Sequence, residues 1–385
     1  MGRVSADPAP RLHYVDHLRV LLTALVILHH AAITYGAPGG WYYREDPANG
    51  LAAEVLLVLF VATNQAYFMG FFFFIAGYFT PAAYDRKGTA AFLRDRALRL
   101  GVPLVVYAAC IDPAMGHALR ASAGGDAGSL ADAYRAMVAR LPRVGVGPLW
   151  FVEILLMFSV AYAVVRLVGR SAPGGRATEG RAPGLGRLAG CAAALGLVSF
   201  AVRVRMPVGE SLPFPHIQPP YAAQYIAMFP LGVAAYRRGW LASFPDRYAR
   251  AAAWAVGALI VAFFVLFGVG EAASTPIEAY MGGWRWQALA SAMWEQSLGV
   301  AMIVLVLATF RRRMNGVSAL GKRLAAGAYA AYILHAPVLL GVSLACRGWE
   351  AGGLVKFLVV GPVAVALTFA LGDVVRRLPG ARAVL

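Results

Sequence analysis

The sequence predicts an all-α protein, a polytopic transmembrane bundle of about ten spanning helices. Apolar residues make up 60% of the 385 positions and charged residues only 14%, whereas a soluble surface needs roughly a quarter of its residues charged. The charges are bunched, which leaves apolar windows of roughly twenty residues, the length that crosses a hydrocarbon core of about 30 Å. β-barrel alternation is absent, and a backbone in lipid must satisfy its own hydrogen bonds. The apolar runs are therefore predicted to be helices.

The whole chain, 1–385, is interpreted as one integral membrane domain, because no polar stretch is long enough to build a soluble core. Residues 1–17 are polar and are predicted to form a cytoplasmic N-terminal segment. The first apolar run ends near Gly36 and is interpreted as a retained helix rather than a signal peptide, since it carries charged residues. The remaining helices are expected at about 51–79, 100–117, 148–168, 188–204, 221–236, 251–270, 287–310, 325–346 and 353–375.

Basic residues predict the orientation of this bundle. The net charge is +16, which in a soluble protein would point to nucleic acid. Here the basic residues lie in short connections between apolar runs, so nucleic acid is excluded as a partner and membrane lipid is expected. With ten helices, 25 of the 35 Lys and Arg residues fall on the side of the two termini. The positive-inside rule then places both termini in the cytoplasm.

No metal site is expected. The three cysteines, Cys110, Cys191 and Cys346, lie far apart in apolar segments, and no group of His, Cys, Asp and Glu has metal-ligand spacing. They are interpreted as small buried hydrophobic residues.

The first helix carries the best candidate site. Arg19 and His30 are eleven residues apart, which places them on one helix face and about 16 Å apart along the axis. Asp16 falls on the same side, so a polar stripe follows an otherwise apolar helix. Histidine can take a proton from a hydroxyl group, and arginine can hold an anion. The alternative is that Asp16 and Arg19 are interfacial anchors and that His30 hydrogen-bonds to a neighbouring helix.

A second group of candidates is basic. Arg94, Arg96 and Arg99 precede the third predicted helix, and Arg96 and Arg99 are spaced to share one helix face. Such a pair suits the phosphates of coenzyme A through charge-assisted hydrogen bonds. The same arginines would also suit anionic lipid head groups.

Four further side chains are candidate substrate-binding residues. Trp150 and Glu153 lie at the start of the fourth predicted helix, where Glu153 would orient an imidazole or bind a sugar hydroxyl, although an interfacial Trp also serves as an anchor. Tyr332 and His335 lie near the middle of the ninth, where a structural hydrogen bond between helices is the alternative. Polar residues within other helices, Glu295 and Gln296 among them, are interpreted more simply as contacts between helices.

Together these residues resemble the acyltransferase-3 family of integral membrane proteins. Arg19 followed by His30 in a first helix is similar to the signature of the family, and the opening segment resembles the branch that includes periplasmic-glucan modifying proteins. The chain departs from the family in lacking the Ser residues often found around Trp150 and Glu153. Four later segments are similar to family motifs in the same order: Phe73–Phe79, Phe92–Pro103, Gly147–Glu153 and Tyr329–Pro337.

The resemblance implies a membrane enzyme, an O-acyltransferase. Acyl-CoA is the implied co-substrate, with acetyl most expected and succinyl also possible, and no metal is implied. The acceptor would be a hydroxyl of a carbohydrate or another cell-envelope molecule. His30 would be the general base, and Arg19 with the Arg96 and Arg99 pair would match the family's arginines. The location implied is the bacterial plasma membrane, and a homodimer is compatible with the sequence.

Two other classes of function remain open from the residues alone. A secondary transporter or a lipid or glycan flippase would use the polar stripe of the first helix as a substrate or proton path. The absence of an internal repeat counts against a transporter. A third alternative, a non-catalytic membrane scaffold, does not explain why Arg19 and His30 share one helix face.

Overall fold

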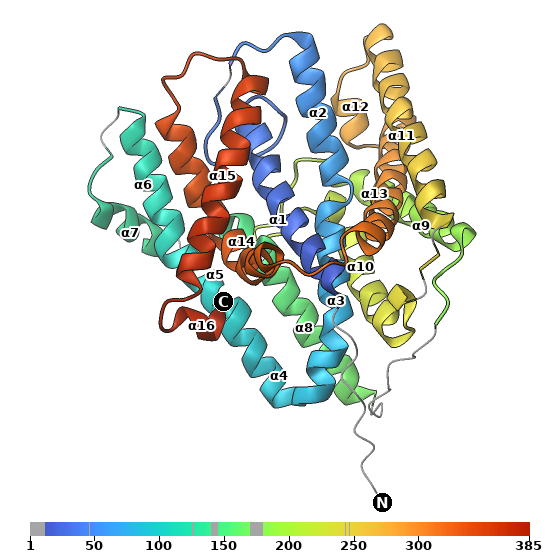
Figure 1. Cartoon of the computed structure of the whole chain (residues 1–385). Helices are drawn as coiled ribbons and strands as arrows, with labels where there is room; N and C mark the ends of the chain where they lie inside the picture. The colour runs from blue at the N-terminus through green and yellow to red at the C-terminus, as the bar shows by residue number, and fades with distance from the viewer. Residues whose placement is uncertain are drawn as a thin grey trace, which may run out of the picture.

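The computed structural model describes residues 12–45, 47–124, 127–139, 145–169, 180–242, 244–245 and 247–385. Residues 1–11 of the predicted N-terminal segment and 170–179 of the basic loop after the fourth predicted helix lie outside the described residues. Within these ranges the chain is a bundle of helices (Figure 1), which confirms the predicted all-α class.

The bundle consists of long helices joined by shorter ones. The first half comprises α1 (His13–Thr34), α2 (Leu51–Gln65), α3 (Phe68–Lys87), α4 (Thr89–Arg96), α5 (Val102–Val106), α6 (Asp112–Ser122), α7 (Leu130–Ala139) and α8 (Trp150–Val168). The second half comprises α9 (Leu185–Arg203), α10 (Pro219–Arg237), α11 (Arg247–Ala272), α12 (Glu278–Met281), α13 (Trp286–Arg313), α14 (Ala319–Ala345), α15 (Gly353–Val375) and α16 (Ala381–Val384).

Nine helical stretches within the described ranges are long and apolar enough to cross a membrane. They match nine of the ten predicted spans. The tenth prediction, 221–236, is a helix as expected, α10, but it is not one of these nine. Its proline, tyrosine and glutamine residues lower its hydropathy, and it packs inside the bundle against α3 and α9. The protein is therefore a polytopic membrane protein.

Two predicted spans have a different course in the structure. The run 51–79 is broken after Gln65 into α2 and α3. The basic segment 85–99, predicted as a connection, is largely helical, and a nearly continuous helical stretch runs from Thr89 to Ser122. Two π-helical segments, Ala97–Gly101 and Tyr107–Ile111, interrupt this stretch.

Proline explains the first of these interruptions. Pro103 lacks the N–H that would donate to the carbonyl of Arg99 one turn earlier. The Tyr329 hydroxyl of α14 donates to that carbonyl instead, at 2.5 Å. The hydrogen bond from Tyr329 thus replaces the helical hydrogen bond that Pro103 cannot make. It also holds the backbone of Arg99 beside α14. π-Helical segments of this kind are frequent at functional sites.

Glycine allows α3 and α10 to approach each other closely. A Cβ added at Gly77 would lie 2.1 Å from the carbonyl oxygen of Phe229, and one added at Gly232 would lie 2.0 Å from the carbonyl oxygen of Phe74. In lipid, where apolar burial gives little driving force between helices, such backbone proximity is a main source of packing energy.

The Gly232→Ala variant is expected to lower the free energy of unfolding by about 1–3 kcal/mol, because the added methyl group forces the two helices apart. A drop in the melting temperature of the detergent-purified protein would report the effect. Gly257→Ala in α11 is the matched control, since its Cβ meets no atom within 4 Å. Equal melting temperatures for the two variants would contradict this packing role.

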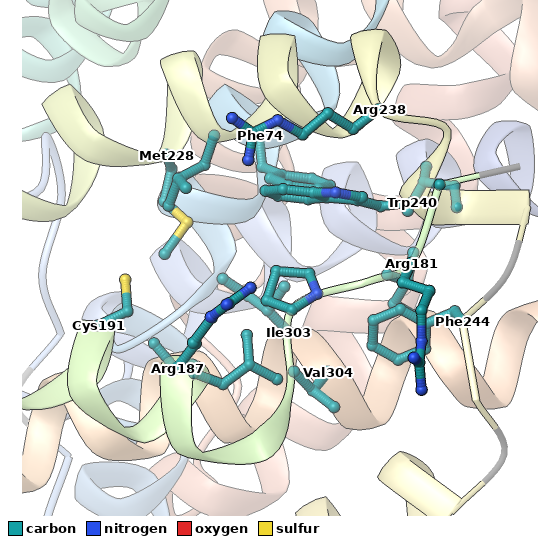
Figure 2. A pocket seen from close by; sticks show the side chains of 17 residues that line it. Phe74, Arg181, Arg187, Cys191, Met228, Arg238, Trp240, Phe244, Ile303 and Val304 are labelled. Carbon is teal, nitrogen blue, oxygen red and sulfur yellow. The ribbon is translucent and has the colours of Figure 1, made fainter. Parts of the chain in front are cut away.

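A cavity of about 500 Å³ lies between α3, α9, α10 and α13 (Figure 2). Two further cavities, of about 310 and 160 Å³, lie on the α1 and α14 side of α3 and are lined by several of the predicted site residues.

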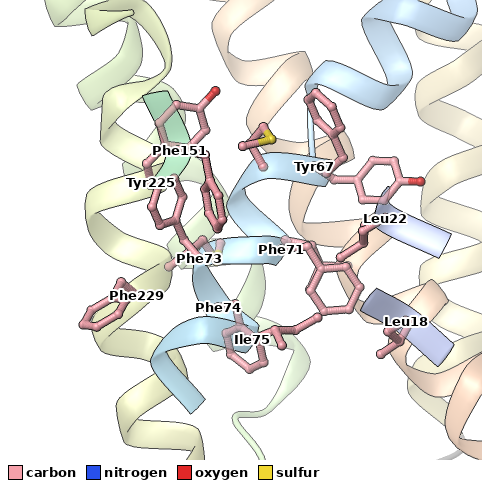
Figure 3. Close-up of a cluster of buried hydrophobic side chains, with 14 of the residues drawn as sticks. Leu18, Leu22, Tyr67, Phe71, Phe73, Phe74, Ile75, Phe151, Tyr225 and Phe229 are labelled. Atoms are coloured by element: carbon pink, nitrogen blue, oxygen red, sulfur yellow. The ribbon is translucent and has the colours of Figure 1, made fainter. Parts of the chain in front are cut away.

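Aromatic residues of α3 lie between the 500 Å³ cavity and the two smaller cavities. Phe73 packs against Phe151 of α8, with ring centroids 4.6 Å apart, and against Tyr225 of α10 at 5.3 Å. Leu18 and Leu22 of α1 lie on the other side of the same core (Figure 3). The phenylalanine-rich part of α3 thus forms a packed aromatic layer in the middle of the bundle.

Candidate active site

His30 lies in a stack of three nearly parallel rings. Its imidazole is 3.7 Å from the Trp41 ring between centroids, with an interplanar angle of 15°, and 5.4 Å from the His335 ring, at 13°. His29 meets His30 edge-on, at 5.6 Å. The stack joins α1, the loop that follows it and α14. These contacts hold the His30 ring in one orientation, as a base needs.

The nitrogen atoms of these rings are suited to proton transfer. Nδ1 of His335 contacts the backbone carbonyl of Tyr332. A carbonyl only accepts, so Nδ1 carries the hydrogen and Nε2 keeps a free lone pair. Nε2 of His335 and Nδ1 of His30 are buried, and neither has a hydrogen-bond partner among the described residues. Because buried polar groups are normally satisfied, these two atoms are candidates for hydrogen bonds to a polar substrate.

The 160 Å³ cavity, here called the histidine cavity, lies beside this stack. His30 and His29 line it, together with Trp150, Tyr332 and Gln65. Its remaining polar lining comes from Gln218, Tyr221 and Tyr225 near the start of α10. Aromatic walls with a few hydrogen-bonding groups are typical of small-molecule sites. Trp150 thus lines the same cavity as His30.

The 310 Å³ cavity, here called the arginine cavity, contains three of the predicted arginines. Arg19, Arg96 and Arg99 line it, with Tyr329 and Tyr332 of α14. Nε of Arg96 is buried and makes no hydrogen bond within the described residues, while its guanidinium lies 5.1 Å from the centre of the Phe92 ring. The cavity therefore combines three cations with one N–H donor, on Arg96, that has no partner among the described residues.

Two of the predicted residues lie beside this cavity rather than in its wall. Asp16 is 3.9 Å from Arg19, from Oδ1 to Nη1, and is positioned to orient that arginine. Arg94 is exposed on α4 and does not line the cavity. A similar carboxylate neighbour supports Arg99, whose Nε lies 3.3 Å from Oδ1 of Asp95.

Tyr332 lines both cavities and lies between them. It is buried, and its hydroxyl donates to the backbone carbonyl of Pro148. Phe72 and Phe151 pack against its ring, at 6.3 and 5.8 Å between centroids. The arginine cavity and the histidine cavity are thus neighbouring compartments that share one aromatic wall.

Glu153 is placed differently from the other candidates. Its carboxylate accepts a hydrogen bond from the backbone N–H of His216 at 3.1 Å and lies 3.0 Å from Nδ1 of the His216 ring. It does not line either cavity. The geometry fits a residue that holds the 211–218 segment against α8, next to Gln218 of the histidine cavity.

Glu295 and Gln296 form a contact between helices, in agreement with their interpretation as structural residues. Arg203 donates to both carboxylate oxygens of Glu295, at 2.8 and 2.9 Å. Gln296 donates to Glu295, and Gln224 donates to Gln296. This buried network ties α9, α10 and α13 together behind the histidine cavity.

The place of Trp41, the closest ring to His30, in the candidate site was not predicted from the sequence, and neither was that of the α10 tyrosines. Trp41 lies in a Gly- and Pro-rich loop, and a tryptophan in a loop gives no signal of its partner. Within the described part of the chain, no group of three or more His, Cys, Asp or Glu side chains is arranged to hold a metal ion.

The fold and these two cavities define an integral membrane protein with a basic compartment next to a histidine-containing one. Residues 12–373 match the family model described as an acyltransferase domain, and the chain therefore belongs to the acyltransferase-3 family, whose members transfer acyl groups.

Curated relatives match over a shorter stretch. Glucans biosynthesis protein C of Salmonella typhimurium (strain LT2) is 30% identical over 102 residues, which are 26% of this chain and 25% of that protein. The proteins of the same name from Salmonella typhi and Salmonella schwarzengrund (strain CVM19633) match to the same extent. The similarity thus covers about a quarter of the length of these relatives. No solved structure matches the chain significantly.

Proposed function

We propose that this protein transfers an acyl group from acyl-CoA to a hydroxyl of a cell-envelope carbohydrate, with His30 as the general base. The observation that carries the proposal is the shared wall at Tyr332, which has a cavity with three arginines on one side and the cavity beside His30 on the other. A thioester bound from one side and an alcohol bound from the other would meet there, out of water.

The arginine cavity supplies the donor site. Arg19, Arg96 and Arg99 match the negative charge of the CoA phosphates, and charge-assisted hydrogen bonds of this type are the strong ones. The acyl end would then reach past Tyr332 toward His30. Acetyl is the expected group, with succinyl as the second, and the basic end of the bundle would face the cytoplasm, where acyl-CoA is made.

The reaction requires one proton to be moved twice. His30 accepts the hydroxyl proton as the acceptor oxygen attacks the thioester carbonyl. The tetrahedral intermediate then collapses, the carbon–sulfur bond breaks, and the imidazolium returns the proton to the sulfur of CoA. The products are an ester and free CoA, so no further reactant is needed. General-base catalysis of this kind contributes about 10²–10⁴-fold to a rate.

A glucan is the proposed acceptor. The name of the relatives links them to glucan biosynthesis, and the histidine cavity offers aromatic and amide side chains that suit a sugar hydroxyl. Gln218, Tyr221 and Gln65 would hold the acceptor, with Trp150 as an aromatic wall.

Release of CoA by the purified protein in nanodiscs, followed with a thiol reagent in the presence of glucan oligosaccharides, tests this proposal. Arg96→Gln and Arg99→Gln are each expected to raise KM for acetyl-CoA by about 10- to 100-fold, because each removes a charged hydrogen bond worth about 1.5–3 kcal/mol. Arg94→Gln is the matched control, since Arg94 is exposed and lies outside the cavity.

Unchanged KM values for both cavity variants would contradict the donor site. Transport of a glycan or lipid without any release of CoA would instead support the transporter or flippase interpretation.

A further inference from the structure

The 500 Å³ cavity on the far side of α3 is not used by the proposed reaction. It lies between α3, α9, α10 and α13, and its volume falls within the range of small-molecule sites. Most of its lining is apolar and includes Phe74, Met228, Val300, Ile303, Val304 and Leu307. An apolar cavity of this size is suited to an alkyl chain.

The mouth of this cavity is basic. Arg181, Arg187 and Arg238 line it, and no Asp or Glu is among the described residues of its wall. Figure 2 shows Arg187 and Arg238 on opposite sides of the cavity, and the Arg238 guanidinium lies 5.9 Å from the centre of the Trp240 ring. Two arginines and a tryptophan around an opening match an anionic head group.

The position of the cavity along the bundle fits a lipid. Arg237 at the end of α10 pairs with Asp85 at the end of α3, with 2.6 Å from Nη1 to Oδ2. The mouth therefore lies at the same end of the bundle as α4 and its arginines. Basic side chains at that level meet the head groups of anionic lipids, and the apolar interior lies toward the hydrocarbon core.

We propose that this cavity binds an anionic phospholipid, with its phosphate between Arg187 and Arg238 and one acyl chain along α13. Acyl-CoA is also an anionic amphiphile, but the geometry favours the lipid. This cavity shares no lining residue with the histidine cavity, whereas the arginine cavity shares Tyr332 with it. Apart from the arginines and Trp240, its wall offers few groups to bind the polar adenosine and pantetheine parts of CoA.

Native mass spectrometry of the detergent-purified full chain tests the proposal directly. Phosphatidylglycerol is titrated against phosphatidylcholine, which has no net charge. The Arg187→Gln/Arg238→Gln variant is expected to bind phosphatidylglycerol about thirtyfold more weakly, at about 1 kcal/mol for each arginine near the membrane surface. Both side chains are exposed, so their replacement leaves the packed core in place. Arg250→Gln, on α11 and outside the cavity wall, is the matched control.

A second readout locates the lipid. Cys191 of α9 lines the cavity. In a variant that retains Cys191 as its only cysteine, phosphatidylglycerol is expected to slow labelling by a small thiol reagent, and phosphatidylcholine is not. Equal binding of the two lipids, or equal binding by the wild type and the double arginine variant, would overturn the proposal. Displacement of the lipid by acetyl-CoA would assign the cavity to the acyl donor instead. Neither readout depends on acyl transfer.

Discussion

The His30→Ala variant is expected to lose acyl transfer, with kcat reduced by about 10²–10⁴-fold. His30 faces the histidine cavity, packs against both Trp41 and His335, and has a buried Nδ1 without a partner in the described structure. Removing its imidazole removes the proton acceptor and leaves the arginine cavity unchanged. Binding of acetyl-CoA should therefore persist while CoA release stops.

The control for this variant is His17→Ala. His17 lies on the same helix, but its ring contacts the carbonyl of Gly316, far from the stack. His17→Ala should retain kcat, and both variants should elute as folded protein at the wild-type volume. If His30→Ala kept normal transfer, the assignment of the base would be wrong, and His335, with its free Nε2, would be the next residue to test.

The Glu295→Leu variant is expected to lose about 3–5 kcal/mol of stability, because it leaves the Arg203 charge buried without its carboxylate. The Arg203 side chain is 1% exposed and donates to both oxygens of Glu295. This loss is a large part of the stability of a typical protein, about 5–15 kcal/mol. Thermal unfolding followed by size-exclusion chromatography would show a lower melting temperature and a reduced yield.

The pair offers its own control. Replacing both residues, as in Arg203→Leu/Glu295→Leu, removes both charges and should recover much of the lost stability. Glu271→Gln, at an exposed carboxylate of α11, should leave the melting temperature unchanged. If Glu295→Leu cost less than about 1 kcal/mol, the ion pair would not be the link between α9 and α13 that the structure indicates.

The helices and much of the candidate site were predictable from local patterns. Apolar runs of membrane length locate the long helices, and the eleven-residue spacing of Arg19 and His30 is a property of one helix alone. The Arg96 and Arg99 pair is equally local, and both residues line the cavity that also contains Arg19.

Features that depend on contacts between distant segments could not be predicted. The stacking of Trp41 on His30, the shared position of Tyr332 and the pairing of Glu153 with His216 all join residues from different elements. The π-helical segment at Arg99 had a local signal in Pro103, but its stabilising partner, Tyr329, lies 230 residues further along the chain. Spacing gives no information about such partners.

Transfer of a radiolabelled acetyl group from acetyl-CoA to a glucan by the purified protein in nanodiscs is the most direct test of the proposed acyl transfer. We expect label in the glucan as an ester that alkali releases, with one free CoA for each acetyl group transferred. Acetyl-CoA that binds the protein but is recovered intact, with no CoA released and no label in the glucan, would contradict it.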